Sequence, residues 1–110
     1  MDRLHQILHE EVLAYAGSGG GAKLRRIALM DDVRRVYGVI AIDHPRREDR
    51  RASGVIVLAR IVENRVVIEE DATDKPLVDA LEQRGVPREQ IILAYLGEPI
   101  PDLERFELKL

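Results

Sequence analysis

The sequence predicts an α+β domain in which an antiparallel sheet carries helices on one face. Three observations support this prediction. An apolar stripe with helical spacing opens the chain, β-branched runs of strand length follow through its middle, and a second helical stripe precedes a last apolar run. The chain has 110 residues, no internal repeat and no long linker, so a single domain over residues 1–110 is expected.

The first helix is predicted over residues 3–16. Its apolar side chains recur every three or four residues, at Leu4, Ile7, Leu8, Val12 and Tyr15. The glycine-rich residues 17–21 are expected to end it, because glycine loses the most backbone entropy in a helix.

Four strands are then predicted to form an antiparallel meander: Leu24–Met30, Val36–Ile42, Ser53–Val62 and Arg65–Glu70. The segment DDVRR supplies the first turn, and the polar segment 44–51 is a loop. Glu63 and Asn64 are expected to form a tight hairpin turn. Apolar residues on both faces of the third strand indicate a central strand that is covered on at least part of both faces.

A second helix is predicted within DATDKPLVDALEQRG, residues 71–85. Thr73 or Asp74 is expected to cap it, Pro76 to lie in its first turn and Gly85 to end it. The run Ile91–Leu96 is predicted to be a final strand. As an apolar sheet edge it is expected to be covered or paired, so self-association into a homo-oligomer is expected.

Composition favours a cytoplasmic protein that does not enter a membrane. No apolar run approaches the roughly 20 residues that a membrane helix needs. The first residues lack the basic start and unbroken apolar stretch of a signal peptide. The chain has no cysteine and therefore no disulfide or thiolate site, which fits a reducing compartment.

The charge of the chain is unevenly distributed along its length. Net charge is −3, but residues 1–60 hold 11 basic and 8 acidic side chains, whereas residues 61–110 hold 6 and 12. Four arginines of the loop are candidates for contacting nucleic-acid phosphates or a charged protein partner: Arg46, Arg47, Arg50 and Arg51. The loop lacks the aromatic residues that stack on single-stranded bases, and no predicted helix carries these arginines into a major groove.

The segment AGSGGGAKLRR, residues 16–26, resembles a phosphate-binding loop only in part. It lacks the Gly-Lys-Ser/Thr ending and runs from a helix into a strand, so a flexible connection is the simpler interpretation. His5 and His9 share one side of a helix, as a zinc-binding pair does, but no third ligand is evident. They are therefore expected to be surface residues on a polar face.

The acidic residues Glu69, Glu70, Asp71 and Asp74 lack the ligand pattern and central glycine of a calcium loop. They are interpreted as a solvated strand end followed by a helix cap. No catalytic residue, cofactor site or metal site is predicted. A small enzyme or ligand-binding domain that uses Glu69, Asp71 and His44 stays open as an alternative.

The segment GVIVLARIVENRVVIEEDATDKPLVDALEQRGVPREQIILAY, residues 54–95, resembles the XisI-like family, the fdxN element excision controlling factor proteins. A D-x-T-E segment of that family is matched by Asp71, Thr73 and Asp74. Its G-V/I-P-K-E-D-I-V-L-A/G-F segment is matched by GVPREQIILAY, residues 85–95. Asp71, Thr73, Gly85 and Pro87 are the signature residues, and their expected roles are structural: Thr73 caps, Gly85 ends the helix and Pro87 fixes the exit.

The resemblance implies a non-enzymatic regulatory factor for the excision of a DNA element. Such proteins commonly accompany a XisH-like partner, so the resemblance also implies a protein–protein interaction and admits an antitoxin-like role. It transfers no catalytic residue. Direct DNA binding through the arginine loop stays open as a second function.

Overall fold

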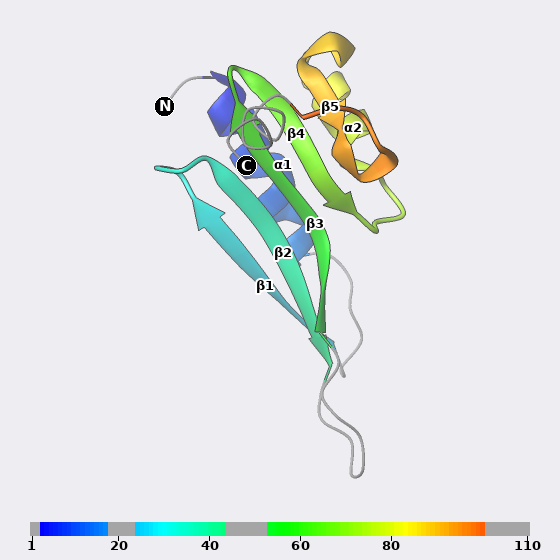
Figure 1. Ribbon diagram of the computed structural model, residues 1–110. Coiled ribbons are helices and arrows are strands. Elements are labelled where there is room, and N and C mark those ends of the chain that lie inside the picture. Colours follow the sequence, from blue (N-terminus) through cyan, green and yellow to red (C-terminus); the bar gives the residue numbers. More distant parts are fainter. Residues whose placement is uncertain (1–2, 18–23, 44–52, 101–110) are drawn as a thin grey trace, which may run out of the picture.

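The computed structural model describes residues 3–17, 24–43 and 53–100. Their helices, strands and short 3-10 turns follow in this order (Figure 1): α1 Arg3–Gly17, β1 Leu24–Asp31, β2 Val36–Asp43, β3 Ser53–Val62, β4 Arg65–Asp71, α2 Leu77–Gln83, η1 Arg88–Gln90, β5 Ile91–Leu93 and η2 Ala94–Leu96. Among these residues, no helix is long and apolar enough to cross a membrane.

The five strands form one sheet in the order β1-β2-β3-β4-β5. The first four pair antiparallel with their sequence neighbours, as the predicted meander requires, and β5 adds parallel to β4 after the crossover through α2. Both helices lie on one face of this sheet, so the α+β prediction is confirmed (Figure 1).

One hydrophobic core lies between the helices and the sheet. The strands contribute the side chains that alternate onto the helix-bearing face, and the helices contribute their apolar stripes. The largest fully buried members are Tyr37, Leu8, Ile68, Leu77, Leu81, Val12, Val39, Val57 and Val66. Burial at about 25 cal/mol per Å² of apolar surface makes this layer the main source of stability.

The predicted turns are confirmed. Glu63 and Asn64 both have positive φ, 51° and 64°, which is the conformation of a two-residue hairpin turn. In the β1–β2 turn, Asp31 Oδ1 accepts hydrogen bonds from the backbone N–H groups of Val33 (3.1 Å) and Arg34 (2.9 Å).

The second helix starts later than predicted. It begins at Leu77 and Pro76 precedes it, so neither Thr73 nor Asp74 is its N-cap residue. The reason is that proline disfavours a helical conformation in the residue before it, here Lys75, and therefore excludes the preceding segment from the helix. The predicted end is confirmed: Gly85 has φ 93°, and Val86 N–H bonds to the carbonyl of Leu81 at 3.0 Å.

The final strand is shorter than predicted: β5 ends at Leu93, and residues 94–96 form a 3-10 turn instead of continuing the strand. The carboxylate of Glu98 accepts a hydrogen bond from Leu93 N–H at 2.7 Å, and Glu98 N–H bonds to the carbonyl of Leu93 at 3.2 Å. This pair turns the chain back on itself. The Leu93 N–H holds the pKa of Glu98 below its usual range, with a smaller contribution from Arg88.

Candidate functional site

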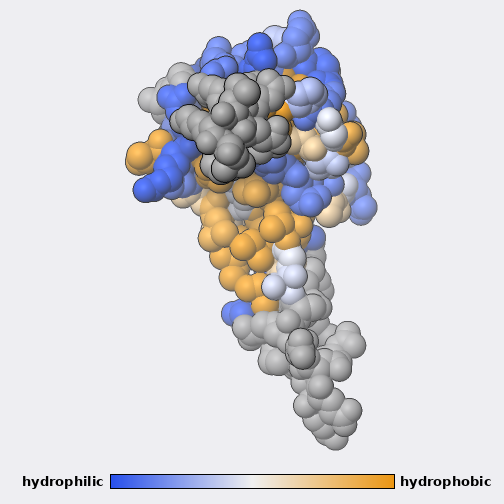
Figure 2. Space-filling view, in the orientation of Figure 1, coloured by the Kyte–Doolittle hydropathy of each residue, from blue (hydrophilic) through white to orange (hydrophobic). Residues whose placement is uncertain are grey.

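The face of the sheet that is opposite the helices carries exposed apolar side chains. Two cross-strand rows are set by the register: Ile27 pairs with Ile40, which pairs with Val55, and Leu29 pairs with Gly38, which pairs with Leu58. With Ile42 these side chains form what we call the open face: Ile27, Leu29, Ile40, Ile42, Val55 and Leu58. Figure 2 shows them as a continuous hydrophobic surface over β1, β2 and β3.

Exposure is greatest at three positions of the open face. Ile27 is 40%, Leu29 52% and Val55 43% exposed. Gly38 lies in the middle of the face, where an added Cβ would stand 3.1 Å from the Cδ1 of Leu58. The side chain of Leu58 therefore lies over this glycine, which flattens the surface. A contiguous exposed apolar face is typical of a site for another macromolecule.

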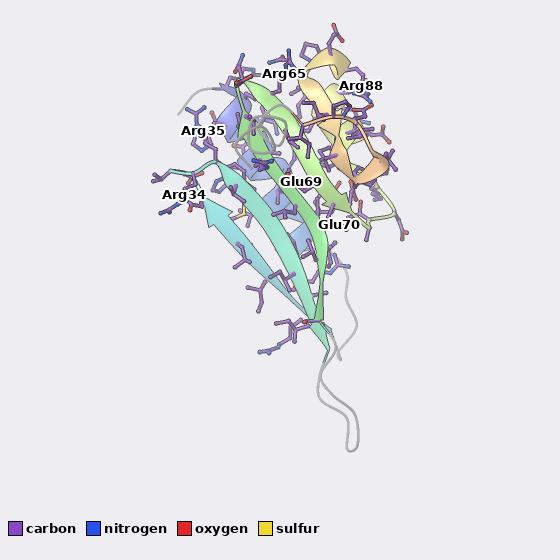
Figure 3. The ribbon with its side chains drawn as sticks, in the orientation of Figure 1. Arg34, Arg35, Arg65, Glu69, Glu70 and Arg88 are labelled. Carbon is purple, nitrogen blue, oxygen red and sulfur yellow. The ribbon has the colours of Figure 1, made fainter. Side chains whose placement is uncertain are left out.

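Charged residues border the open face. Arg25 lies beyond Ile27 on β1, and Arg60 pairs with Glu69 at 2.7 Å between β3 and β4. Figure 3 shows Arg34 and Arg35 in the β1–β2 turn and Arg65 at the start of β4. The β1–β2 turn and the β3–β4 turn, which precedes Arg65, lie at the same end of the sheet, since Val36 pairs with Arg60. Part of this charge is compensated, because Arg34 pairs with Asp31 at 3.1 Å.

The arginines that the sequence singled out, Arg46, Arg47, Arg50 and Arg51, lie outside the described residues, as does His44. The structure therefore places none of them relative to the open face. The loop that contains them joins β2 to β3, two of the strands that form the open face.

The signature residues Asp71 and Thr73 hold the connection from β4 to α2. Asp71 Oδ1 accepts hydrogen bonds from the backbone N–H (2.9 Å) and hydroxyl (2.6 Å) of Thr73. Its Oδ2 accepts one from Leu77 N–H, the first residue of α2, at 2.7 Å. The helix start is thus satisfied by Asp71 from outside the helix. Pro87, the fourth signature residue, precedes η1 in an extended conformation.

The acidic residues of β4 and its exit are therefore not grouped around a cation. Glu69 pairs with Arg60, and both oxygens of Asp71 accept hydrogen bonds from the protein. Across residues 3–17, 24–43 and 53–100, no group of three or more His, Asp or Glu side chains is placed to hold a metal ion.

The prediction that His5 is a surface residue is wrong. His5 is only 5% exposed, and its Nε2 lies 3.0 Å from Asp32 Oδ1. His9 Nδ1 lies 2.9 Å from the same oxygen, and the hydroxyl of Tyr37 donates to it at 3.0 Å. Both imidazole rings also lie against the Tyr37 ring, with centroids 5.7 and 5.6 Å away. Asp32 and Tyr37 were not predicted as partners of these histidines, because the helical spacing of His5 and His9 does not indicate which residues of other elements contact them.

This cluster fixes the first half of α1 against the β1–β2 turn. The hydrogen bond with His9 contributes most to holding the pKa of Asp32 below its usual value of 3.8, so the carboxylate is ionised at neutral pH. The hydrogen bonds of Asp32 with His5, His9 and Tyr37 give this carboxylate a role in holding the fold together.

A groove of about 820 Å³ separates α1 from the β4–α2 connection and α2. Tyr15 donates its hydroxyl to the carbonyl of Lys75 across it, and burial raises the pKa of that hydroxyl. Its charged lining residues carry both signs: Glu11, Arg26, Asp74, Lys75 and Asp79. Because neither sign dominates, the groove indicates no particular ligand.

Comparisons with known proteins agree with this fold. The model of the family described as XisI protein matches residues 1–106. A crystal structure of a XisI-like protein from Anabaena variabilis has a TM-score of 0.72 and 18% identity, with 83% of each chain covered. The structure of the fdxN element excision controlling factor XisI from the same organism has a TM-score of 0.68 and 21% identity, covering 84% of this chain and 83% of that one.

A comparison with curated protein sequences found no match. The structural likeness shows a shared fold, and the family match extends over 106 of 110 residues. The signature segments at Asp71 and Gly85 also stand at the two ends of α2, where each has a defined structural role. The chain therefore belongs to the XisI protein family.

Proposed function

We propose that this chain is a non-enzymatic controlling factor for the excision of a DNA element, and that it acts by binding a protein partner through the open face. A XisH-like protein is the first candidate partner. Family membership supports the regulatory role, since one solved structure of the same fold is that of an fdxN element excision controlling factor.

The observation that carries the binding mode is the open face. It presents aliphatic side chains on three adjacent strands, without a helix over them among the described residues. Burying a fully exposed Leu or Val side chain contributes about 1.5–3 kcal/mol before the costs of association, and the partly exposed side chains of the open face each contribute a fraction of this. A partner that covers several of these side chains therefore gains a substantial hydrophobic contribution.

The acidic residues that contact other parts of the protein are best interpreted as stabilising the fold. The oxygens of Asp71 satisfy the start of α2, Asp32 joins α1 to the first hairpin, and Glu69 neutralises Arg60. Each of these three carboxylates thus has partners that hold the fold together. This leaves the open face as the surface best suited to function.

Co-expression with the XisH-like product of a neighbouring gene tests the proposal. We expect the two proteins to co-elute from affinity and size-exclusion columns in a fixed ratio. Recovery of the chain alone, with the candidate partner folded in the same lysate, contradicts the XisH-like assignment.

Two further assays address the alternatives. Direct DNA binding predicts a gel shift at low salt that disappears as salt rises, because phosphate contacts release counterions. Replacing Arg46, Arg47, Arg50 and Arg51 with alanine would abolish that shift. A ligand-binding function predicts that a metal or nucleotide raises the melting temperature, since a ligand that binds only the native state stabilises it.

A further inference from the structure

Strand β1 is a long and regular edge of the sheet. It pairs with β2 over eight residues in unbroken register, without the bulges that interrupt β2–β3 and β3–β4. No other described strand pairs with its outer side. It also carries no proline. Natural sheets usually protect such an edge with a bulge, a proline, charged side chains or a covering segment, because its free backbone groups are a template for another strand. The charged residues of β1, Arg25, Arg26 and Asp31, stand toward its two ends and leave residues 27–30 uncharged.

We propose that a second copy of this chain pairs with β1 antiparallel, about a two-fold axis at Ala28, so that the two sheets become one. In such a two-fold symmetric pair, a contact between one residue of the first copy and another residue of the second copy is repeated with the two copies exchanged. Pairing centred on Ala28 places Arg25 opposite Asp31 of the second copy, and Ile27 opposite Leu29. Each of these contacts then occurs twice.

Charge and burial select this register. Arg25 and Asp31 lie at opposite ends of β1 and on the same face as Ile27 and Leu29, as the pairing with β2 shows. Among the described residues, no carboxylate pairs with Arg25. The carboxylate of Asp31 is ionised at neutral pH, because hydrogen bonds from Arg34 lower its pKa. Its Oδ2 also pairs with the exposed Arg34 side chain at 3.1 Å, so Arg25 of the second copy would share this carboxylate with Arg34. The register therefore brings opposite charges together across the strands.

Neighbouring symmetric registers fit less well. Centring the axis on Ile27 places Arg25 opposite Leu29 and leaves Asp31 beyond the last pair. Centring it on Leu29 places Ile27 opposite Asp31. Only the axis at Ala28 matches an apolar side chain with an apolar one, and an arginine with an aspartate, on the face where all four are exposed or partly exposed.

The other edge of the sheet is a weaker candidate, although the sequence predicts self-association there. Strand β5 has only three residues, and Ile91 and Ile92 are already buried within one chain. Edge-to-edge pairing at β1 leaves the open faces of both copies uncovered and adjacent. The proposal therefore does not depend on the proposed partner, and either can fail alone.

Sedimentation velocity of the full chain over roughly 1–200 μM tests the pairing. We expect a concentration-dependent dimer. Leu29→Lys and Arg25→Glu each weaken the dimer about tenfold or more, because each substitution acts at two symmetric positions. Leu96→Lys, on a 67% exposed side chain near the other edge, and Arg65→Glu, a matched charge reversal away from β1, leave it unchanged. A monomer at all concentrations, or a dimer insensitive to both β1 substitutions, overturns the proposal.

Cysteine cross-linking tests the register through the gain of a covalent dimer, a result that destabilisation of the monomer cannot produce. The chain has no cysteine, so a single introduced thiol can pair only with its copy. On the axis, Ala28→Cys faces itself at a distance that suits a disulfide. We expect it to form a covalent dimer under mild oxidation at low micromolar concentration. Val33→Cys, in the β1–β2 turn and 89% exposed, should remain monomeric. Equal cross-linking of both, or of neither, contradicts the register.

Discussion

At the scale of single residues, the family signature acts through hydrogen bonds at the ends of α2. Asp71 was assigned to the signature from sequence, but its role was not, because Pro76 displaces the helix start by several residues. The carboxylate reaches across that gap to Leu77 N–H while also accepting the Thr73 bonds. Residue patterns identify such a position without indicating its partners.

Replacing Asp71 with asparagine should lower the free energy of unfolding by about 1–2 kcal/mol, since one of two accepting oxygens becomes a donor. Urea denaturation measures the change. Asp74→Asn, an exposed position in the same segment, is the matched control and should be close to neutral. Equal effects of the two substitutions would show that the Asp71 hydrogen bonds contribute little.

Gly85 is a second residue-scale test. Its φ of 93° is strained for any residue with a Cβ, while the space around that Cβ is open. Gly85→Ala should therefore lower the free energy of unfolding by about 1 kcal/mol through backbone strain alone. Gly54→Ala has equal space without positive φ, so it should be neutral or slightly stabilising. Thermal unfolding of both variants distinguishes strain from packing.

At the scale of elements, the bounds of the first four strands are predicted to within one residue, because alternation and turn chemistry are local, whereas the predicted last strand is three residues too long. The parallel addition of β5 was not predicted, since periodicity carries no information about the pairing partner. Apolar residues on both faces of β3 predict a central strand covered on at least part of both faces, and β3 is the middle strand of the sheet. The helices of the described part of the chain cover one face, and Val55 on the other face is 43% exposed. The open face is thus readable in the sequence as an excess of apolar residues that one helical layer does not bury.

The contact between α1 and the first hairpin should depend on pH through Asp32. Its pKa is lowered in the folded state, chiefly by the hydrogen bond with His9. The stabilisation is therefore fully present above the unfolded value near 3.8 and is lost as the pH falls through the lower folded value. Asp32→Ala should be less stable than the natural chain at pH 5, and the gap should narrow below pH 3.8. A gap that stays constant down to pH 2 contradicts this linkage.

At the scale of the whole molecule, one face of the sheet builds the core, and the part of the other face over β1, β2 and β3 is available for contact, whereas Val67 of β4 on that side is fully buried. The expectation of a protein partner rests on the family resemblance, together with the lack of a predicted catalytic set and the uneven charge, which by itself equally suits a solvated surface. The place of contact follows only once the register brings Ile27, Ile40 and Val55 into one row. No single segment contains that surface, so the apolar excess of β3 indicates that such a surface exists, while its extent follows only from the strand pairing.

The central claim is that the open face binds a protein partner, and isothermal titration of the XisH-like partner into Val55→Lys tests it most directly. Lysine at this half-exposed site keeps the fold but places a charge within the proposed contact, at the β3 end of the row that begins at Ile27. We expect at least a tenfold loss of affinity, about 1.4 kcal/mol, with a negative heat-capacity change for the natural chain. Leu96→Lys, equally charged but outside the open face, should bind like the natural chain. Unchanged affinity for Val55→Lys would contradict the account.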